Sequence, residues 1–196
     1  MGADRLHEAF RAVARADFLR PADRRLSEAD APLNIGCGQT NSQPRTVYAM
    51  LELLAVEPGQ RVLDVGSGSG WTTALLAHLV GPDGMVIGVE LEPRLAKFGA
   101  ENLSRYHFPW AVIRRSPLDV LGAPDDAPFD RILVSASAPT LPHALVAQLA
   151  VGGAMVIPVG AHMTKVVRTG PDDAEITTHG LYSFVPLRVP RDGAES

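Results

Sequence analysis

The spacing of hydrophobic residues is helical at the start of the chain. Leu6, Phe10, Val13 and Phe18 recur at intervals that fit one face of a helix, which predicts a single amphipathic helix. Pro21 is expected to end that helix, since proline has no backbone N–H to continue the hydrogen-bond ladder. The chain therefore begins with an element that lays its apolar face on a core.

The next segment has no regular pattern. Residues 27–44 are rich in glycine, asparagine, aspartate and proline, which predicts an irregular loop. Structureless loops of this length are uncommon in compact domains and are often functional, so the segment is a candidate binding loop. After it, an apolar stripe over residues 47–54 predicts a second helix, closed by the Pro58-Gly59 pair.

In the middle of the chain, short apolar runs alternate with amphipathic stretches. The expected strands are residues 61–65, 85–90, 111–113, 131–135 and 154–157, and the expected helices are 71–80, 92–106 and 142–149. Strands that alternate with helices predict an α/β fold with a mostly parallel, doubly wound sheet covered on both faces.

The C-terminal part changes character. Residues 164–168, 176–178 and 182–187 are expected to be strands separated by turns too short for parallel crossovers. We therefore expect antiparallel strands at one edge of the sheet. Residues 190–196 are expected to be a frayed end.

Composition limits the class of protein. A chain of 196 residues with 46% hydrophobic and 20% charged residues fits one soluble domain. We expect a single domain over 1–196, with an N-terminal helix and substrate loop in 1–44, a cofactor-binding α/β core in 45–160 and edge strands in 161–190. The net charge of -4 gives no footprint for a nucleic-acid backbone.

The cysteine content and the N-terminal segment indicate which cross-links, metal sites and cellular location to expect. The single cysteine, Cys37, excludes an internal disulfide, and no cysteine–histidine cluster has the spacing of a zinc site, so no metal is expected. No signal peptide or membrane span is visible. We expect a cytoplasmic protein that binds neither nucleic acid nor membrane, and we expect it to be a monomer.

A glycine-rich turn follows the first central strand. It reads Asp64-Val65-Gly66-Ser67-Gly68-Ser69-Gly70 and leads into a helix. A dinucleotide fingerprint would need glycine at the position of Trp71, and no Lys-Ser/Thr pair follows to make a phosphate-binding loop. The remaining spacing, G-x-G-x-G after an acidic strand end, resembles motif I of class I S-adenosylmethionine-dependent methyltransferases.

Glu90 ends the next predicted strand. In that place a carboxylate can accept hydrogen bonds from the two hydroxyls of a ribose, as the acidic residue of dinucleotide sites does. In the alternative interpretation these residues bind no ligand: the glycines form only a tight turn, and Glu90 is a solvated strand end. The βαβ context favours a cofactor site.

Segments along nearly the whole chain resemble protein-L-isoaspartate O-methyltransferases, in the order of that family. The matching segments are Asp30, residues 35–44 (IGCGQTNSQP), residues 129–139 (FDRILVSASAP), residues 149–160 (LAVGG to PVG) and residues 184–187 (FVPL). The resemblance implies a Rossmann-like methyltransferase that uses S-adenosyl-L-methionine, releases S-adenosyl-L-homocysteine and methylates the side-chain carboxyl of L-isoaspartyl residues in damaged peptides or proteins.

The resemblance also implies site residues. Ser42 is the expected catalytic residue, and a helix N-cap is its alternative role. Asp30, Thr40, Ala136 and Ser137 are expected to bind the acceptor, and Asp30 could instead order the loop. The expected cofactor-binding residues are Gln39, Thr40, Asn41, Ser42, Asp64, Gly66, Ser67, Gly68, Ser69, Gly70, Glu90 and Leu91.

Three positions depart from the family pattern. Glu28 and Asn41 stand where the family usually has tyrosine and isoleucine, and residues 114–119 replace a Gly-Asp-Gly segment that meets the adenine. Asp119 is a candidate substitute for that aspartate. Two alternatives follow: a carboxyl methyltransferase for a dedicated peptide or other acid, and a non-enzymatic module that keeps the fold.

Overall fold

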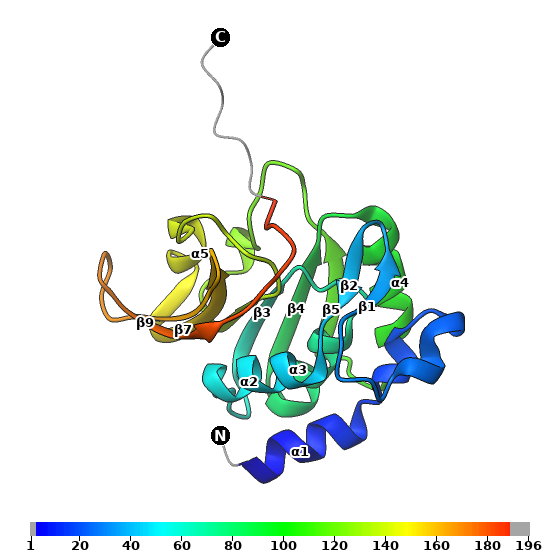
Figure 1. The fold of residues 1–196 in the computed structure, drawn as a ribbon. Helices are drawn as coiled ribbons and strands as arrows, with labels where there is room; N and C mark the ends of the chain where they lie inside the picture. The colour runs from blue at the N-terminus through cyan, green and yellow to red at the C-terminus, as the bar shows by residue number, and fades with distance from the viewer. Residues whose placement is uncertain (1–2, 189–196) are drawn as a thin grey trace.

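A seven-stranded sheet forms the centre of the computed structural model, which describes residues 3–188 (Figure 1). Its strands lie in the order β5-β4-β3-β6-β7-β8-β9. They are β3 (Arg61–Val65), β4 (Met85–Glu90), β5 (Ala111–Arg115), β6 (Phe129–Val134), β7 (Leu149–Val159), β8 (His162–Arg168) and β9 (Ala174–Leu181). The first five are parallel, and β8 and β9 add antiparallel strands at one edge. The predicted fold class is confirmed.

The register brings the carboxyl ends of the central strands to one edge of the sheet. Val65 of β3 lies opposite Val89 of β4 and Val134 of β6. The glycine turn after β3 and Glu90, the last residue of β4, therefore lie at the same edge, where open parallel sheets bind ligands.

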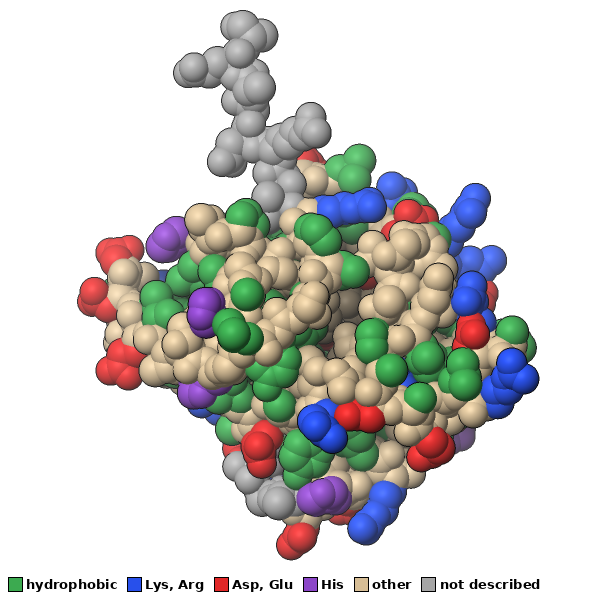
Figure 2. Space-filling view, in the orientation of Figure 1, with side chains coloured by type: hydrophobic (Ala, Val, Ile, Leu, Met, Phe, Trp, Pro, Cys, Tyr) green, Lys and Arg blue, Asp and Glu red, His purple; other side chains and the backbone are tan. Residues whose placement is uncertain are grey.

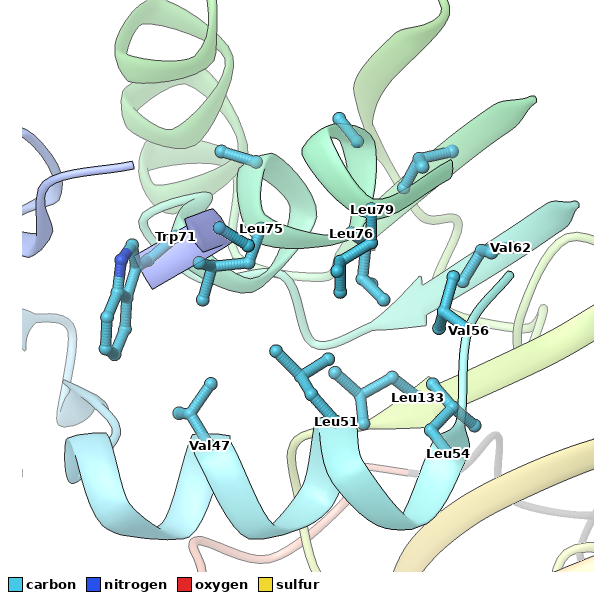
Figure 3. Close-up of a cluster of buried hydrophobic side chains, with 14 of the residues drawn as sticks. Val47, Leu51, Leu54, Val56, Val62, Trp71, Leu75, Leu76, Leu79 and Leu133 are labelled. Atoms are coloured by element: carbon cyan, nitrogen blue, oxygen red, sulfur yellow. The ribbon is translucent and has the colours of Figure 1, made fainter. Parts of the chain in front are cut away.

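Helices cover both faces. On one face lie α1 (Ala3–Ala12), α2 (Pro44–Leu54), α3 (Trp71–Val80) and α4 (Pro93–Leu103). On the other lie the short helix α5 (His143–Val146) and the 3-10 turn η3 (Pro124–Asp126). Figure 3 shows how α2 and α3 face each other, with Val47, Leu51 and Leu54 pointing toward Leu75 and Leu76. This packing fixes the start of α3, and with it the glycine turn.

The first predicted helix is shorter than expected. It ends at Ala12, and Ala14 is extended before two 3-10 turns, η1 (Arg15–Phe18) and η2 (Pro21–Leu26). At 3.6 residues per turn, a continued helix would place Phe18 about 120° around the axis from Leu6, away from the apolar face. The break lets Phe18 reach the core by another route, where it is fully buried.

The segment predicted as an irregular loop contains a hairpin. Strands β1 (Leu33–Gly36) and β2 (Gln39–Asn41) pair antiparallel through a turn in which Gly36, Cys37 and Gly38 have positive φ. The prediction of no regular structure in residues 27–44 was wrong. Glycines such as Gly36 and Gly38 are typical of loops, but their positive φ also makes a tight hairpin turn possible.

Three other predicted elements are shorter than expected or missing. Residues 104–106 leave the predicted fourth helix as a turn, and the helix predicted over 142–149 is the four-residue α5, because strand β7 already begins at Leu149. Residues 182–187, predicted as an edge strand, form none: Tyr182 leaves β9 and the chain turns back over the sheet, where Pro186 forms an isolated bridge with Ser137.

Candidate active site

The glycine turn is held against the neighbouring strand. Gly66, Gly68 and Gly70 all have positive φ, a conformation that residues with a Cβ rarely adopt. The N–H groups of Gly66 and Ser67 donate to the Val89 carbonyl at 2.9 and 3.1 Å. The turn therefore has one fixed path between β3 and α3.

Gly70 has a packing role as well. A Cβ built there would lie 2.9 Å from the Gly99 carbonyl oxygen of α4 and 2.9 Å from Ile113 Cδ1. Only glycine lets the turn pass so close to α4. Gly70 faces that helix and does not line the cavity described below.

Glu90 lies beside the turn. It is 8% exposed, and its carboxylate accepts hydrogen bonds from the backbone N–H of Gly68 and of Glu92, both at 2.9 Å. Each carboxylate oxygen can accept a further hydrogen bond, and Glu90 lines the cavity. This is the geometry of an acceptor fixed in advance for two hydroxyl donors.

Asp64 lies beneath the turn, fully buried, and does not line the cavity. Its Oδ2 accepts from the hydroxyls of Thr72 and Thr73, both at 2.7 Å, while Oδ1 has no partner among the described residues. Burial raises its pKa to about 6, the two threonine hydrogen bonds oppose that rise, and the Glu90 charge adds to it. Asp64 thus anchors the first turn of α3 from below.

The acceptor side is built by β2 and the residue after it. Gln39, Thr40, Asn41 and Ser42 all line the cavity. The N-cap of α2 is Gln43, whose side chain makes no capping hydrogen bond, so Ser42 is not the N-cap. The alternative structural role for Ser42 is therefore wrong.

Asp30 caps α2 from a distance. Its Oδ1 accepts from the Arg45 N–H at 3.0 Å, and its Oδ2 accepts from Gln43 Nε2 at 3.1 Å. The hydrogen bond from Arg45, followed by that from Gln43, lowers the pKa of Asp30. Asp30 is outside the cavity wall, so the structure favours its role in ordering the loop over direct acceptor contact.

A C-terminal segment that the sequence did not single out as part of the site closes another side. Residues 183–188 line the cavity. Ser137 holds them: its N–H donates to the Val185 carbonyl at 2.8 Å, and its carbonyl accepts from Leu187 N–H at 2.7 Å. The Ser137 hydroxyl donates to the Gly160 carbonyl, so Ser137 supports the wall and Ala136 forms part of it. The resemblance of residues 184–187 to the family was the sequence signal that could have marked this segment as part of the site.

The segment after β5 forms the remaining side. Ser116, Leu118, Val120 and Leu121 line the cavity, whereas Asp119 is exposed and does not. The Ser116 hydroxyl donates to the Val120 carbonyl at 3.0 Å and folds the segment back on itself. Apolar side chains thus occupy the place of the expected Gly-Asp-Gly segment.

These walls enclose one cavity of about 370 Å³, a size typical of small-molecule sites. Figure 2 shows this face hollowed between the hairpin and the C-terminal segment. The predicted site residues that line the cavity are Gln39, Thr40, Asn41, Ser42, Gly66, Ser67, Gly68, Ser69, Glu90, Leu91 and Ala136. Four predicted site residues do not line the cavity but contact the segments that do: Asp30, Asp64, Gly70 and Ser137.

The cavity fits the expected cofactor. It offers close backbone approach at the glycine turn, the Glu90 carboxylate, and the buried Ser67 hydroxyl, which has no hydrogen-bond partner within residues 3–188. In the same part of the chain, no group of three acidic, cysteine or histidine side chains could hold a metal ion. None of the described helices is long and apolar enough to cross a membrane.

Comparison with known proteins agrees with this site. The family model for protein-L-isoaspartate(D-aspartate) O-methyltransferase matches residues 1–191. The chain is 44% identical to a protein-L-isoaspartate O-methyltransferase of Methanopyrus kandleri, over 94% of this chain and 84% of that one. It is 47% identical to the one of Anaeromyxobacter dehalogenans, over 90% of this chain and 87% of that one.

Solved structures share the fold. A Plasmodium falciparum protein assigned as a protein-L-isoaspartate O-methyltransferase, solved with S-adenosyl-L-homocysteine, matches with a TM-score of 0.83 at 26% identity, over 95% of this chain and 91% of that one. A second protein-L-isoaspartate O-methyltransferase matches with a TM-score of 0.82 at 22% identity, over 94% of this chain and 61% of that one. The family resemblance seen in the sequence is confirmed: the chain belongs to the protein-L-isoaspartate(D-aspartate) O-methyltransferase family.

Proposed function

We propose that this chain transfers the methyl group of S-adenosyl-L-methionine to the side-chain carboxylate of L-isoaspartyl residues, within the cavity above the carboxyl edge of its sheet. Family membership supports the activity, since the chain is a methyltransferase of this class. The observation that carries the proposal is that Glu90 and Ser42, from opposite ends of the site, line one cavity. The backbone amide nitrogen that follows the residue then displaces methanol from the methyl ester to close a succinimide, and water opens this ring in part to normal aspartate.

The glycine turn and Glu90 form the cofactor end. We assign the ribose hydroxyls to the Glu90 carboxylate, and the methionine part to the turn at Gly66, Ser67 and Gly68. A carboxylate that accepts two hydroxyls discriminates against ligands that lack them. When bound, the cofactor supplies an electrophilic methyl group on a sulfonium.

The acceptor end lies along β2. An isoaspartyl carboxyl has an unperturbed pKa near 4, so at neutral pH it is already the nucleophile and needs no strong general base. Positioning can then supply roughly 7 to 11 kcal/mol in favourable cases. We assign Ser42 to hydrogen-bond this carboxylate, with Thr40 and Ala136 shaping the pocket around it.

A paired peptide assay tests the acceptor. The enzyme is given an L-isoaspartyl peptide and its aspartyl twin, with radiolabelled S-adenosyl-L-methionine. We expect transfer to the first alone. Equal transfer to both would favour a less selective carboxyl methyltransferase, and no transfer to either, with S-adenosyl-L-homocysteine still bound, would favour a dedicated acceptor or a non-enzymatic module.

A matched pair of serine variants tests the role of Ser42. Ser42→Ala should lower turnover of the isoaspartyl peptide by about tenfold or more, since a hydrogen bond to a charged group is lost. The control is Ser104→Ala, at an exposed serine after α4 whose hydroxyl donates, within the described residues, to the Glu101 carbonyl. Undiminished turnover by Ser42→Ala would refute the role.

Assembly and location are further proposals. We propose a cytoplasmic monomer in which residues 1–44 contribute the acceptor loop, 45–160 the cofactor-binding core and 161–190 the edge strands. The described walls of the cavity all come from one chain, which supports a site that is complete in the monomer. Light scattering coupled to gel filtration should give the mass of one chain, and a dimer mass would contradict the monomer.

A further inference from the structure

Arg15 lies at the base of the acceptor loop. It is 6% exposed, and its guanidinium donates to five backbone carbonyls and one amide oxygen. The accepting atoms are the carbonyls of Ser27, Ala29, Ala31, Asn41 and Ser42 and Oδ1 of Asn41, at 2.7 to 3.2 Å. Arg15 therefore binds backbone carbonyls from both ends of residues 27–42. Its guanidinium carbon also lies 5.5 Å from the ring centroid of Trp71.

Asn41 extends this network into the glycine turn. Its Oδ1 accepts from Arg15 Nε at 2.7 Å, and its Nδ2 donates to Ser69 Oγ at 3.2 Å. Both Asn41 and Ser69 are at least 95% buried. The amide of Asn41 is thus engaged on both sides, which explains a polar residue in a place where the family usually has isoleucine.

Ser69 is held from its other side by α4. Its carbonyl accepts from Asn102 Nδ2 at 3.0 Å, and Asn102 is fully buried. A continuous chain of hydrogen bonds therefore runs from Arg15 through Asn41 and Ser69 to Asn102. It joins the acceptor strand, the cofactor turn and the helix behind that turn.

The stability of the β1–β2 hairpin depends on its contacts with the rest of the protein. It is a separate two-stranded sheet, and an isolated pair of strands is marginally stable in water. It meets the glycine turn twice: Ile35 Cδ1 packs on Gly68, 3.3 Å from where a Cβ would stand, and Asn41 bonds Ser69. A ligand bound against the turn therefore also limits the motion of the hairpin that contacts the turn.

We propose that Asn41 is a positioning residue that couples the two ends of the site. Cofactor bound at the glycine turn orders the acceptor strand β2, and acceptor bound at that strand raises the affinity for the cofactor. Coupling of this kind is reciprocal by thermodynamic necessity. Because Asn41 is occupied by Arg15 and Ser69, it acts through Ser42 and Ser69 and is not an acceptor-binding group. The proposal rests on the proposed function, since its acceptor is an isoaspartyl peptide.

Calorimetry measures the coupling. The Kd of S-adenosyl-L-homocysteine is determined with and without a saturating L-isoaspartyl peptide. In the wild type we expect the peptide to tighten binding about threefold to tenfold, the effect of one buried hydrogen bond. In Asn41→Leu and in Ser69→Ala the ratio should fall to about one, and the double variant should be no lower, because both changes break the same link.

Controls separate coupling from loss of fold. Ser104→Ala should keep the wild-type ratio. Ser69→Ala leaves the hydrogen bonds between Arg15 and Asn41 intact, so it carries the test if Asn41→Leu is unstable. A wild-type ratio of one, or a wild-type ratio retained by Ser69→Ala, would overturn the proposal.

Hydrogen exchange gives a second readout that needs no acceptor. S-adenosyl-L-homocysteine alone should slow amide exchange in residues 33–42 of the wild type and slow it much less in Ser69→Ala. If the wild type fails to methylate the peptide, the proposed function fails, while this measurement still decides the coupling. Equal protection in both proteins would refute the coupling even if methylation is normal.

Discussion

The backbone N–H of Gly68 donates to the carboxylate of Glu90 at 2.9 Å, across 22 positions of sequence. The glycine turn and the acidic strand end therefore form one unit. Glu90→Ala should weaken S-adenosyl-L-homocysteine binding by about 100-fold or more, because two hydrogen bonds to a charged acceptor are lost, each worth about 1.5 to 3 kcal/mol. Isothermal titration calorimetry measures the change.

An exposed glutamate of α4 serves as the control. Glu101→Gln changes an exposed residue of α4 whose ion pair within residues 3–188 is with Lys97, so the Kd of this variant should match the wild type. Glu90→Gln should fall between wild type and Glu90→Ala, since one acceptor oxygen remains. Unchanged affinity in Glu90→Ala would remove Glu90 from the cofactor site.

Gly70 should be the least replaceable residue of the turn. Gly70→Ala places a methyl group 2.9 Å from the backbone oxygen of Gly99, which cannot move away cheaply, in addition to its strain at φ +93°. We expect it to lower the free energy of unfolding by about 3 kcal/mol or more. Urea denaturation followed by circular dichroism measures this.

A variant at Gly59 separates the cost of backbone strain from the cost of steric crowding. It also has positive φ, but a Cβ there would meet nothing within 4 Å. Gly59→Ala should therefore cost only the conformational part, about 1 to 2 kcal/mol. Equal losses in the two variants would show that close packing against α4 is not what requires glycine at position 70.

The sequence pattern located β3, α3 and β4 to the residue, for a physical reason. Each is a short run of residues buried on both sides and bounded by glycine or proline, so local pattern and tertiary burial agree. The same agreement placed the glycine turn and Glu90 together. The alternation of strands with helices, the hydrophobic periodicity and the motif spacing all indicate one fold.

The acceptor loop could not be predicted in this way. Its hairpin is ordered by Arg15, and an arginine in an amphipathic stretch normally marks the solvated face of a helix. Nothing in the local pattern shows that this one is buried among carbonyls of residues 27–42. The side chain of Asn41 and the return of residues 183–188 over the cavity likewise depend on partners far away in sequence.

Asp30 should stabilise the acceptor loop through α2. Asp30→Ala removes the acceptor for the Arg45 N–H, so we expect a lower melting temperature and a higher KM for the isoaspartyl peptide, with the Kd of S-adenosyl-L-homocysteine unchanged. Because the pKa of Asp30 is lowered in the folded state, its stabilisation is present above the unfolded pKa of 3.8 and is lost as pH falls through the folded value.

Arg45→Ala is the matched control for the cap. It removes the ion pair with Asp30 but keeps the backbone N–H, and its side chain is 84% exposed, so the pair should contribute little. We expect near wild-type melting and KM. If Arg45→Ala has the same effect as Asp30→Ala, the ion pair and not the cap carries the role of Asp30.

Asp64 should make stability fall as pH rises. Its pKa is raised from 3.8 to about 6 by burial, so the native state favours the protonated form. Its stabilising contribution is complete below pH 3.8 and is lost as pH rises through about 6, a total of about 3 kcal/mol. Asp64→Asn keeps an acceptor oxygen for Thr72 and Thr73 and carries no charge, so it lacks this loss.

Urea denaturation of both proteins at pH 4 and pH 7.5 measures the effect of Asp64. Relative to the wild type, the free energy of unfolding of Asp64→Asn should rise by about 2 to 3 kcal/mol from the lower pH to the higher. Other titrating groups, such as Asp30, are common to both proteins and cancel in this difference. A difference that stays constant with pH would mean that Asp64 is ionised throughout, and the buried, unpartnered Oδ1 would then need a donor outside the described residues.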